Sequence, residues 1–168
     1  MAVIGSGITF ELDWKPSLTL MAASFDTMGT SIKSFKEPLT RSVKEVINSS
    51  IARNFAVGGR PPWRPLSPLT VFKKGHDTIL VDTGRLSSKA PQMNSWSIDG
   101  IAGEARMDSV SVPYGYYHQG GFFNVRTNTY VPPRVWADIQ EEDADRIEEI
   151  FWEWLEERWD RDVALGRL

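Results

Sequence analysis

Alternating and helical hydrophobic patterns predict different structures in the first third of the chain. Ile8, Phe10, Leu12 and Trp14 alternate with polar residues, which predicts a half-buried strand over residues 7–14. From about Ser17 to Phe35, apolar residues recur at mostly helical spacing and predict a first helix. They are Leu20, Phe25, Met28, Ile32 and Phe35. Pro38 clashes with a preceding helical turn, so we place a break near Glu37 and Pro38 in the first turn of a second helix.

A second apolar stripe predicts a helix that runs from Pro38 until Gly58 and Gly59 stop it. Its members are Leu39, Val43, Val46, Ile47, Ile51 and Phe55. The following stretch, Gly58 to Pro68, has four Pro and two Gly around Trp63 and cannot continue a helix or a central strand. A large aromatic side chain flanked by proline is costly to leave in water. We therefore expect an ordered loop with Trp63 anchored in a groove.

The centre of the chain combines short helical segments with a β-meander. Thr70 to Gly75 predicts a helical turn, and Ile79 to Leu86 an apolar lead into another helix. At its start, an oxygen of Asp82 or Thr83 is expected to cap the helix while Gly84 supplies a permissive backbone. Alternation at Trp96 and Ile98, a two-residue turn at Asp99-Gly100, and a return from Ile101 to Arg106 predict a hairpin. The last expected segments are a third strand over Val110 to Val112 and a packed turn with an exposed loop over Tyr114 to Asn128.

The clearest helix runs from about Glu141 to Asp162 and has two apolar faces. The face expected to contact the core comprises Ile147, Ile150, Phe151, Trp154 and Leu155. Trp152, Trp159 and Val163 project on another side. Either the N-terminal helices cover this second face as well, or it forms a subunit contact, where Trp is enriched. The fold class that follows is α+β: one domain over residues 1–168, with a small antiparallel sheet packed against two N-terminal helices and one long C-terminal helix.

Composition narrows the functional classes. The 168 residues suit one domain, and 41% hydrophobic with 24% charged residues is typical of a folded chain. There is no Cys, which excludes disulfides and thiolate chemistry. Neither a bilayer-length apolar run nor a secretory leader pattern is present, so we expect synthesis in the cytoplasm and no membrane partner.

Charge is unevenly distributed along the chain. Residues 41–90 hold nine Lys or Arg against three Asp or Glu, whereas residues 131–168 hold five against twelve. Three explanations remain open: two unrelated solvated faces, pairing within the chain, or complementary contacts between neighbouring copies in a ring.

Candidate chemistry is sparse. His76 and His118 are the only histidines, and neither has the partner spacing of a metal site. No glycine-rich phosphate loop is present, and the carboxylates of the last helix are typical of a solvated face. We therefore expect no enzyme activity, cofactor or metal. Basic residues of the middle segment raise DNA binding as a second possibility, but the whole chain is acidic and contains no DNA-reading motif. They are Arg53, Arg60, Arg64, Lys73, Lys74, Arg85 and Lys89.

Several ordered phrases between about residues 25 and 150 carry a family resemblance. They are Asn54-Phe55; Pro62-x-Arg64-Pro65-Leu66 with Trp63 and Thr70; Lys73-Lys74; Ile79-Leu80-x-Asp82-Thr83-Gly84-x-Leu86; Tyr116-Tyr117-His118-Gln119-x-Gly121; and Val131-Pro132-Pro133-Arg134. Together they resemble the phage virion morphogenesis, or tail-completion, family. Departures from that pattern are Gly120 for a Phe, Val135-Trp136 for Pro-Phe, and the first strand.

The resemblance implies a structural virion protein of the phage neck or tail, located at the tail end that faces the head. It would form a ring, expected to be hexameric, that terminates the tail tube. The implied partners are further copies, the tube and possibly sheath proteins, and the head-side connector or stopper, while DNA passes the lumen without specific binding. Alternatives are a head-side stopper or adaptor, a monomeric or dimeric adaptor using Trp63 with Trp152 and Trp159, and an enzyme with a carboxylate-lined pocket around His118.

Candidate interface residues come from the basic middle segment, the exposed loops Gly58–Pro68 and Gly120–Tyr130, and the last helix. They are Arg60, Trp63, Arg64, Phe122, Phe123, Arg126, Arg134, Trp152, Glu156 and Trp159. Arg134 is expected to make a bidentate contact with a carboxylate.

Overall fold

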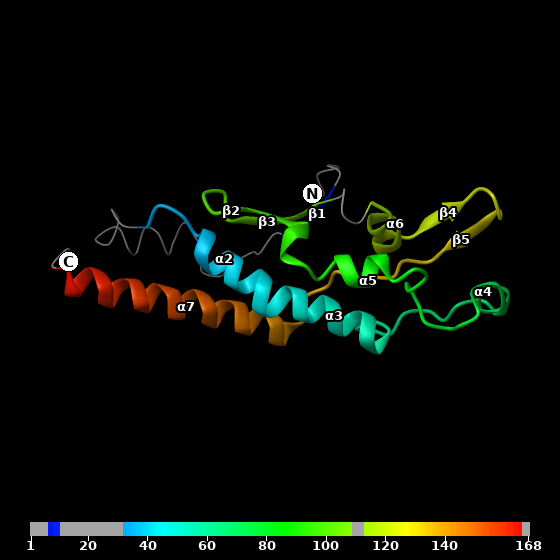
Figure 1. Cartoon of the computed structure of the whole chain (residues 1–168), viewed down its shortest axis with the longest axis horizontal. Helices are drawn as coiled ribbons and strands as arrows, with labels where there is room; N and C mark the ends of the chain where they lie inside the picture. Colours follow the sequence, from blue (N-terminus) through cyan, green and yellow to red (C-terminus); the bar gives the residue numbers. More distant parts are fainter. Residues whose placement is uncertain (1–6, 11–31, 109–112, 166–168) are drawn as a thin grey trace.

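The computed structural model describes residues 7–10, 32–108 and 113–165 (Figure 1). A continuous helix forms its centre, in which α2 (Lys36–Ser42) leads through a π-helical segment, η1 (Val43–Ile47), into α3 (Asn48–Val57). Pro38 lies in its first turn, as predicted. Gly58 ends the helix in the left-handed conformation, with φ +79°, which confirms the predicted stop.

The residues before α2 differ from the prediction. Ile32 to Phe35 are not helical, so a first helix reaching Phe35 is wrong at that end, and residues 17–31 lie outside the described residues. The backbone N–H of Phe35 instead donates to the carbonyl of Gly100 at 2.8 Å. A Cβ atom on Gly100 would lie 2.2 Å from Ser34 Oγ, so glycine is required where this segment crosses the hairpin turn.

Three antiparallel strands form the main sheet in the order β1 (Gly7–Phe10), β3 (Glu104–Asp108), β2 (Trp96–Asp99). The strand expected over residues 7–14 is confirmed for residues 7–10; residues 11–14 and the expected strand Val110 to Val112 lie outside the described residues. Asp99 pairs with Glu104, so the turn comprises residues 100–103 and the predicted two-residue turn is wrong. The Asp99 carboxylate accepts the N–H groups of Ile101 and Ala102, which stabilises this longer turn.

A second set of short elements follows at the other end of the molecule. These elements are α4 (Pro68–Lys74), α5 (Arg85–Lys89), η2 (Met93–Ser95), α6 (Gly115–Gly120), β4 (Phe122–Asn124) and β5 (Thr129–Val131). β4 and β5 pair as an antiparallel hairpin, so the exposed loop expected within residues 114–128 is confirmed only for residues 125–128, and residues 122–124 form a strand instead. The Asn124 side chain accepts the N–H of Arg126, and Asn128 adopts φ +49°, which together form the turn.

Helix starts in this region use local capping. Ser67 Oγ accepts the N–H of Thr70 and caps α4. Gly84, with φ +75°, precedes α5 as expected, but no side chain caps this helix among the described contacts. The predicted cap by Asp82 or Thr83 is therefore wrong.

The long helix α7 (Glu141–Ala164) packs along α2 and η1, and α2 also contacts β2. In Figure 1 the α2–α3 helix accordingly runs between the main sheet and α7. The predicted core face of α7 is confirmed, because all five of its residues are buried; these are Ile147, Ile150, Phe151, Trp154 and Leu155. Each such side chain contributes roughly 1.5–3 kcal/mol by burial. The architecture is the predicted α+β class.

Candidate functional site

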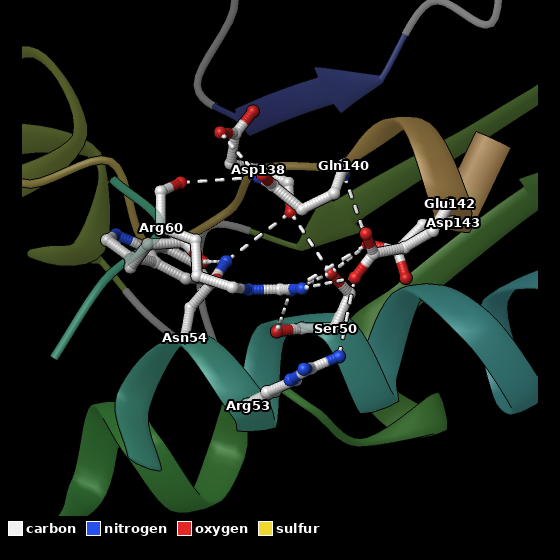
Figure 2. A network of polar contacts seen from close by, with 9 residues as sticks. Ser50, Arg53, Asn54, Arg60, Asp138, Gln140, Glu142 and Asp143 are labelled. Atoms are coloured by element: carbon white, nitrogen blue, oxygen red, sulfur yellow. Dashed lines mark hydrogen bonds and ion pairs between the residues drawn. The ribbon is translucent and has the colours of Figure 1, made fainter. Parts of the chain in front are cut away.

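A dense polar network joins the end of α3 to the start of α7 (Figure 2). Its centre is Arg60, whose Nε donates to Asn54 Oδ1 at 2.7 Å and whose Nη2 donates to Ser50 Oγ at 2.6 Å. Arg60 also faces two carboxylates, Glu142 at 3.3 Å and Asp143 at 3.7 Å. We call this network the Arg60 clamp. Its members are Ser50, Asn54, Arg60, Asp138, Gln140, Glu142 and Asp143.

The clamp shows that part of the charge segregation is used within the chain. Arg53 and Arg60 from the basic segment both pair with Glu142 of the acidic one. Farther along the same helices, Arg41 contacts Glu153 at 2.6 Å, and Arg146 contacts Glu153 at 3.2 Å. The pKa of Glu153 lies below its ordinary value because the side chains of Arg146 and Arg41 donate hydrogen bonds to it.

Trp63 anchors the loop that leaves the clamp. Its side chain is 7% exposed, and its Nε1 donates to the carbonyl of Val135 at 3.0 Å. The ring meets Phe55 edge-on at 5.8 Å between centroids. A Cβ atom on Gly59 would lie 2.5 Å from the Trp63 ring, so glycine is needed at this close approach. The predicted ordered loop is confirmed, and its anchor lies inside the same chain.

Beyond Trp63 the chain forms one wall of an open groove with a volume of about 1430 Å³. α4 and the segment after it lie on one side, and the β4–β5 hairpin lies on the other (Figure 1). The charged side chains that line it are mostly cationic: Arg64, Lys73, Lys74, Arg85 and Arg134, with one carboxylate, Asp82. We call it the basic groove.

Side-chain contacts hold α6 and the 131–137 segment together beneath the groove. Gln119 Oε1 accepts the backbone N–H groups of Trp136 and Ala137, each at 3.1 Å. The N–H of Arg134 donates to the carbonyl of His118 at 2.7 Å. These bonds hold α6 against the segment that leads into α7, and they place His118 and Arg134 beside each other.

Arg134 is a buried cation without a counter-charge in the described part of the chain. It is 7% exposed, and its Nε has no hydrogen-bond partner there. Nη2 makes one long contact, 3.4 Å to the carbonyl oxygen of Arg64. Burial, and then the like charge of Arg64, lowers the pKa of Arg134. The bidentate carboxylate contact expected of Arg134 is not made among the described residues, so that expectation is wrong for this part of the chain.

Two other groove side chains respond to the same electrostatics. Burial lowers the pKa of Lys74; Asp82 opposes this shift and Arg134 adds to it. Burial and the charge of Arg134 also lower the pKa of His118, whose Nδ1 is buried without a partner among the described residues. His118 thus lies beside a cation, while the lining carboxylate, Asp82, acts on Lys74.

The acidic helix α7 ends at the opposite end of the molecule from α4 and the β4–β5 hairpin (Figure 1), and it carries exposed aromatic side chains. Trp152 and Trp159 are each 45% exposed, and Glu156 between them is exposed. The alternative in which the N-terminal helices bury both tryptophans is wrong. The side chain of Val163 lies outside the described residues.

The predicted interface residues therefore fall into three groups. Arg60 and Trp63 serve the interior of the chain; Arg64, Phe122 and Arg134 line the basic groove, with Phe123 and Arg126 exposed on the adjoining hairpin. Trp152, Glu156 and Trp159 lie together on α7. Sequence reasoning considered His118 only in the enzyme alternative and Asp82 only as a helix cap, and it did not single out Tyr130, although all three line the groove. The aromatic composition of residues 114–130 was the signal available for Tyr130.

Two further features are absent from the described residues. No group of His, Asp or Glu is placed there to hold a metal ion. Nor does that part of the chain contain a helix with the length and apolarity needed to cross a membrane.

Comparison with known proteins gives a phage relative. No protein-family model matches the chain, and no solved structure is significantly similar to it. Mu-like prophage FluMu G protein 2 of Haemophilus influenzae is 33% identical over 119 residues, which cover 68% of this chain and 75% of the relative. With that identity over three quarters of the relative, the chain belongs to the family of this Mu-like prophage G protein 2 and is phage-related.

Proposed function

We propose that the chain is a structural protein of the phage neck, without enzymatic activity, that forms a ring to terminate the tail tube and join it to the head-side connector. The observation that carries this proposal is that two unlike surfaces, the basic groove and the exposed aromatic face of α7, belong to different parts of the molecule. The elements that line the groove, α4 and the β4–β5 hairpin, lie at the opposite end from the C-terminal end of α7 (Figure 1). A contact between two different patches, repeated by rotation, closes into a ring. The prophage relative and the ordered tail-completion phrases support the same class of protein.

The electrostatics agree with a ring through which DNA passes. The chain has a net charge of −3, so the assembled ring has no overall attraction for phosphate. Among the cations of the middle segment, Arg60 lies in the Arg60 clamp, and Arg64, Lys73, Lys74 and Arg85 line the basic groove. The partners that this function implies are further copies, the tail tube and possibly the sheath, and the head-side connector or stopper. The protein resides in the virion, at the neck or tail, and no cofactor takes part.

Deleting the gene in the phage that encodes the chain tests this function. We expect heads filled with DNA beside headless tails of irregular length in electron micrographs, because nothing stops tube growth. Wild-type particles should contain the protein at the head-proximal end of the tail, detected with an antibody label. Native mass spectrometry should give a hexamer, either alone or with tail tubes. Particles that lack the protein, or normal infectious particles after deletion, would contradict the proposal.

A second function, a head-side stopper or adaptor, is favoured by the exposed pair Trp152 and Trp159, which suits a contact with an unlike partner. It predicts a different deletion phenotype. Tails would have normal length, and intact heads would accumulate beside them. A stable dimer in native mass spectrometry, with no higher ring, would point instead to an adaptor outside the neck.

A further inference from the structure

The basic groove contains an incomplete charge arrangement. Arg134 is buried, with 7% of its surface exposed, and its Nε lacks a partner among the described residues. Its charged neighbours Arg64 and Lys74 have the same sign, and Asp82 is the one carboxylate in the lining. A buried cation needs an opposite charge and hydrogen-bond acceptors to offset lost hydration. An anionic group from outside this part of the chain would supply both.

The lining of the groove also contains aromatic surface. Tyr130 is 61% exposed, Tyr114 36% exposed, and Phe122 is half-buried. Phe122 packs edge-on against His118, with 5.5 Å between ring centroids. Cations surrounded by aromatic rings suit a protein surface that combines a carboxylate with apolar side chains. The carboxylate would pair with the cations, and the apolar side chains would pack against the rings, whereas a phosphate backbone would leave the rings unused.

α7 offers a surface with the complementary arrangement. Trp152, Glu156 and Trp159 are spaced i, i+4, i+7 and therefore lie along one face of the helix. Trp152 and Trp159 are each 45% exposed, and Glu157 beside this face is exposed too. Indole rings thus flank a carboxylate over two helical turns.

The groove has room for side chains from another copy, since it is open and has a volume of about 1430 Å³. In Figure 1 the C-terminal end of α7 lies at the opposite end of the molecule from α4 and the β4–β5 hairpin, which line the groove. The C-terminal end of α7 in the same copy is therefore remote from the groove.

We infer that the basic groove of one copy receives the Trp152-Glu156-Trp159 face of α7 from the next copy, with Glu156 or Glu157 pairing with Arg134 and Arg64. This inference rests on the proposed ring function and specifies its subunit contact. The contact is heterologous, since groove and helix face are different surfaces of each subunit. It leaves every copy with one groove filled and one helix face covered.

Cysteine cross-linking tests the contact directly, because the chain contains no Cys of its own. The test variant carries Arg64→Cys and Glu156→Cys, both at exposed positions. Treatment with a short bifunctional thiol reagent should give a ladder of covalent multimers on a denaturing gel. The matched control carries Lys44→Cys with Glu156→Cys, where Lys44 is an exposed basic residue of η1 outside the groove. It should remain monomeric, as should each single variant.

Charge exchange gives a second readout that does not depend on the reagent. Arg64→Glu alone and Glu156→Arg alone should each weaken self-association about tenfold or more, measured by sedimentation velocity with tail tubes present if required. The two changes in one chain should restore most of it, because the exchanged charges again face each other. Circular dichroism of each variant separates loss of assembly from loss of folding.

Each outcome separates the contact from the proposed function. Particles that contain the protein and cross-link through residues 64 and 156 support both. Particles that contain the protein but cross-link only in the control pair, or only through Glu156→Cys alone as in a symmetric dimer, overturn the contact and leave the neck function standing. A labelled DNA duplex whose binding is lost in Arg64→Glu while assembly is unchanged also overturns it. Particles without the protein overturn the proposed function itself.

Discussion

Two largely buried arginines have opposite electrostatic surroundings. Arg60 contacts the carboxylates of Glu142 and Asp143 and donates to Asn54 at 2.7 Å. Arg134 contacts a backbone carbonyl at 3.4 Å and has cations for charged neighbours. Both side chains come from sequence phrases rich in proline, and both lie at the approach to another helix.

The difference indicates two kinds of buried charge. At Arg60, acceptors from α3 and from the start of α7 replace the lost water, so the charge holds two distant chain segments together. Among the residues that the structure describes, none replaces the water lost by Arg134, so this part of the fold does not require its charge. Positions that break a local rule of folding are often those used in binding. We therefore propose that Arg134 belongs to the assembly surface, whereas Arg60 belongs to the framework.

Replacing Arg60 should have the largest effect on stability. In Arg60→Met, the carboxylate of Asp143 and the amide of Asn54 lose a buried partner. We expect the free energy of unfolding to fall by about 3 kcal/mol, measured by urea denaturation. Arg53→Met is the matched control, because Arg53 contacts the same Glu142 at 3.3 Å with a side chain 63% exposed. It should cost less than about 0.5 kcal/mol. Equal losses in the two variants would show that the clamp does not depend on Arg60.

Replacing Arg134 in the same way should have a smaller effect of opposite sign. Arg134→Met removes a buried charge and keeps most of the apolar stem, at the cost of one long hydrogen bond. We expect the free energy of unfolding of the unassembled protein to rise by up to about 1 kcal/mol. Urea denaturation at a concentration where the protein is monomeric measures it. A loss as large as that of Arg60→Met would mean that the fold uses the Arg134 charge, and the contrast would disappear.

The elements that sequence reasoning placed correctly are those with long periodic patterns. The helix ending at Gly58 and the core face of α7 each repeat over several turns, so single exceptions do not obscure them. The β4–β5 hairpin has strands of three residues and a turn built on Asn124 and Asn128, which is too short for a periodic signal. Ile32 to Phe35 fit a helical pattern, but a hydrogen bond to the hairpin turn decides their conformation.

The candidate site was predictable only in its components. Composition identified the basic and acidic segments, but which cations pair is decided by contacts such as Arg60 with Glu142, 82 residues apart. Arg134 was expected to hold a carboxylate, and nothing in its local sequence reveals that none lies beside it in the described part of the fold. Tertiary contacts therefore separate the framework charges from the assembly charges.

The smallest effect is expected in the pH dependence of stability. This dependence tests the charge of Arg134 through its effect on the pKa of the neighbouring His118. Burial and the charge of Arg134 lower the pKa of His118, so the unfolded chain binds a proton at higher pH than the folded chain does. Stability should therefore decline as pH falls below about 6.5, the ordinary pKa of histidine, and the decline should end below the lowered pKa. Other charges that line the groove are Arg64, Lys73, Lys74, Asp82 and Arg85.

Thermal unfolding from pH 7.5 to 5, compared between wild type and His118→Gln, isolates this contribution, since His76 is present in both. The slope that His118 adds should be reduced, but not abolished, in Arg134→Met, because burial is the larger of the two causes. If a neighbouring carboxylate fills the groove on assembly, it offsets Arg134, so the same comparison in the assembled protein should show a weaker dependence. If the slope of stability against pH is unchanged in Arg134→Met, the charge of Arg134 does not affect the pKa of His118. Arg134 would then not be the charged centre of the groove.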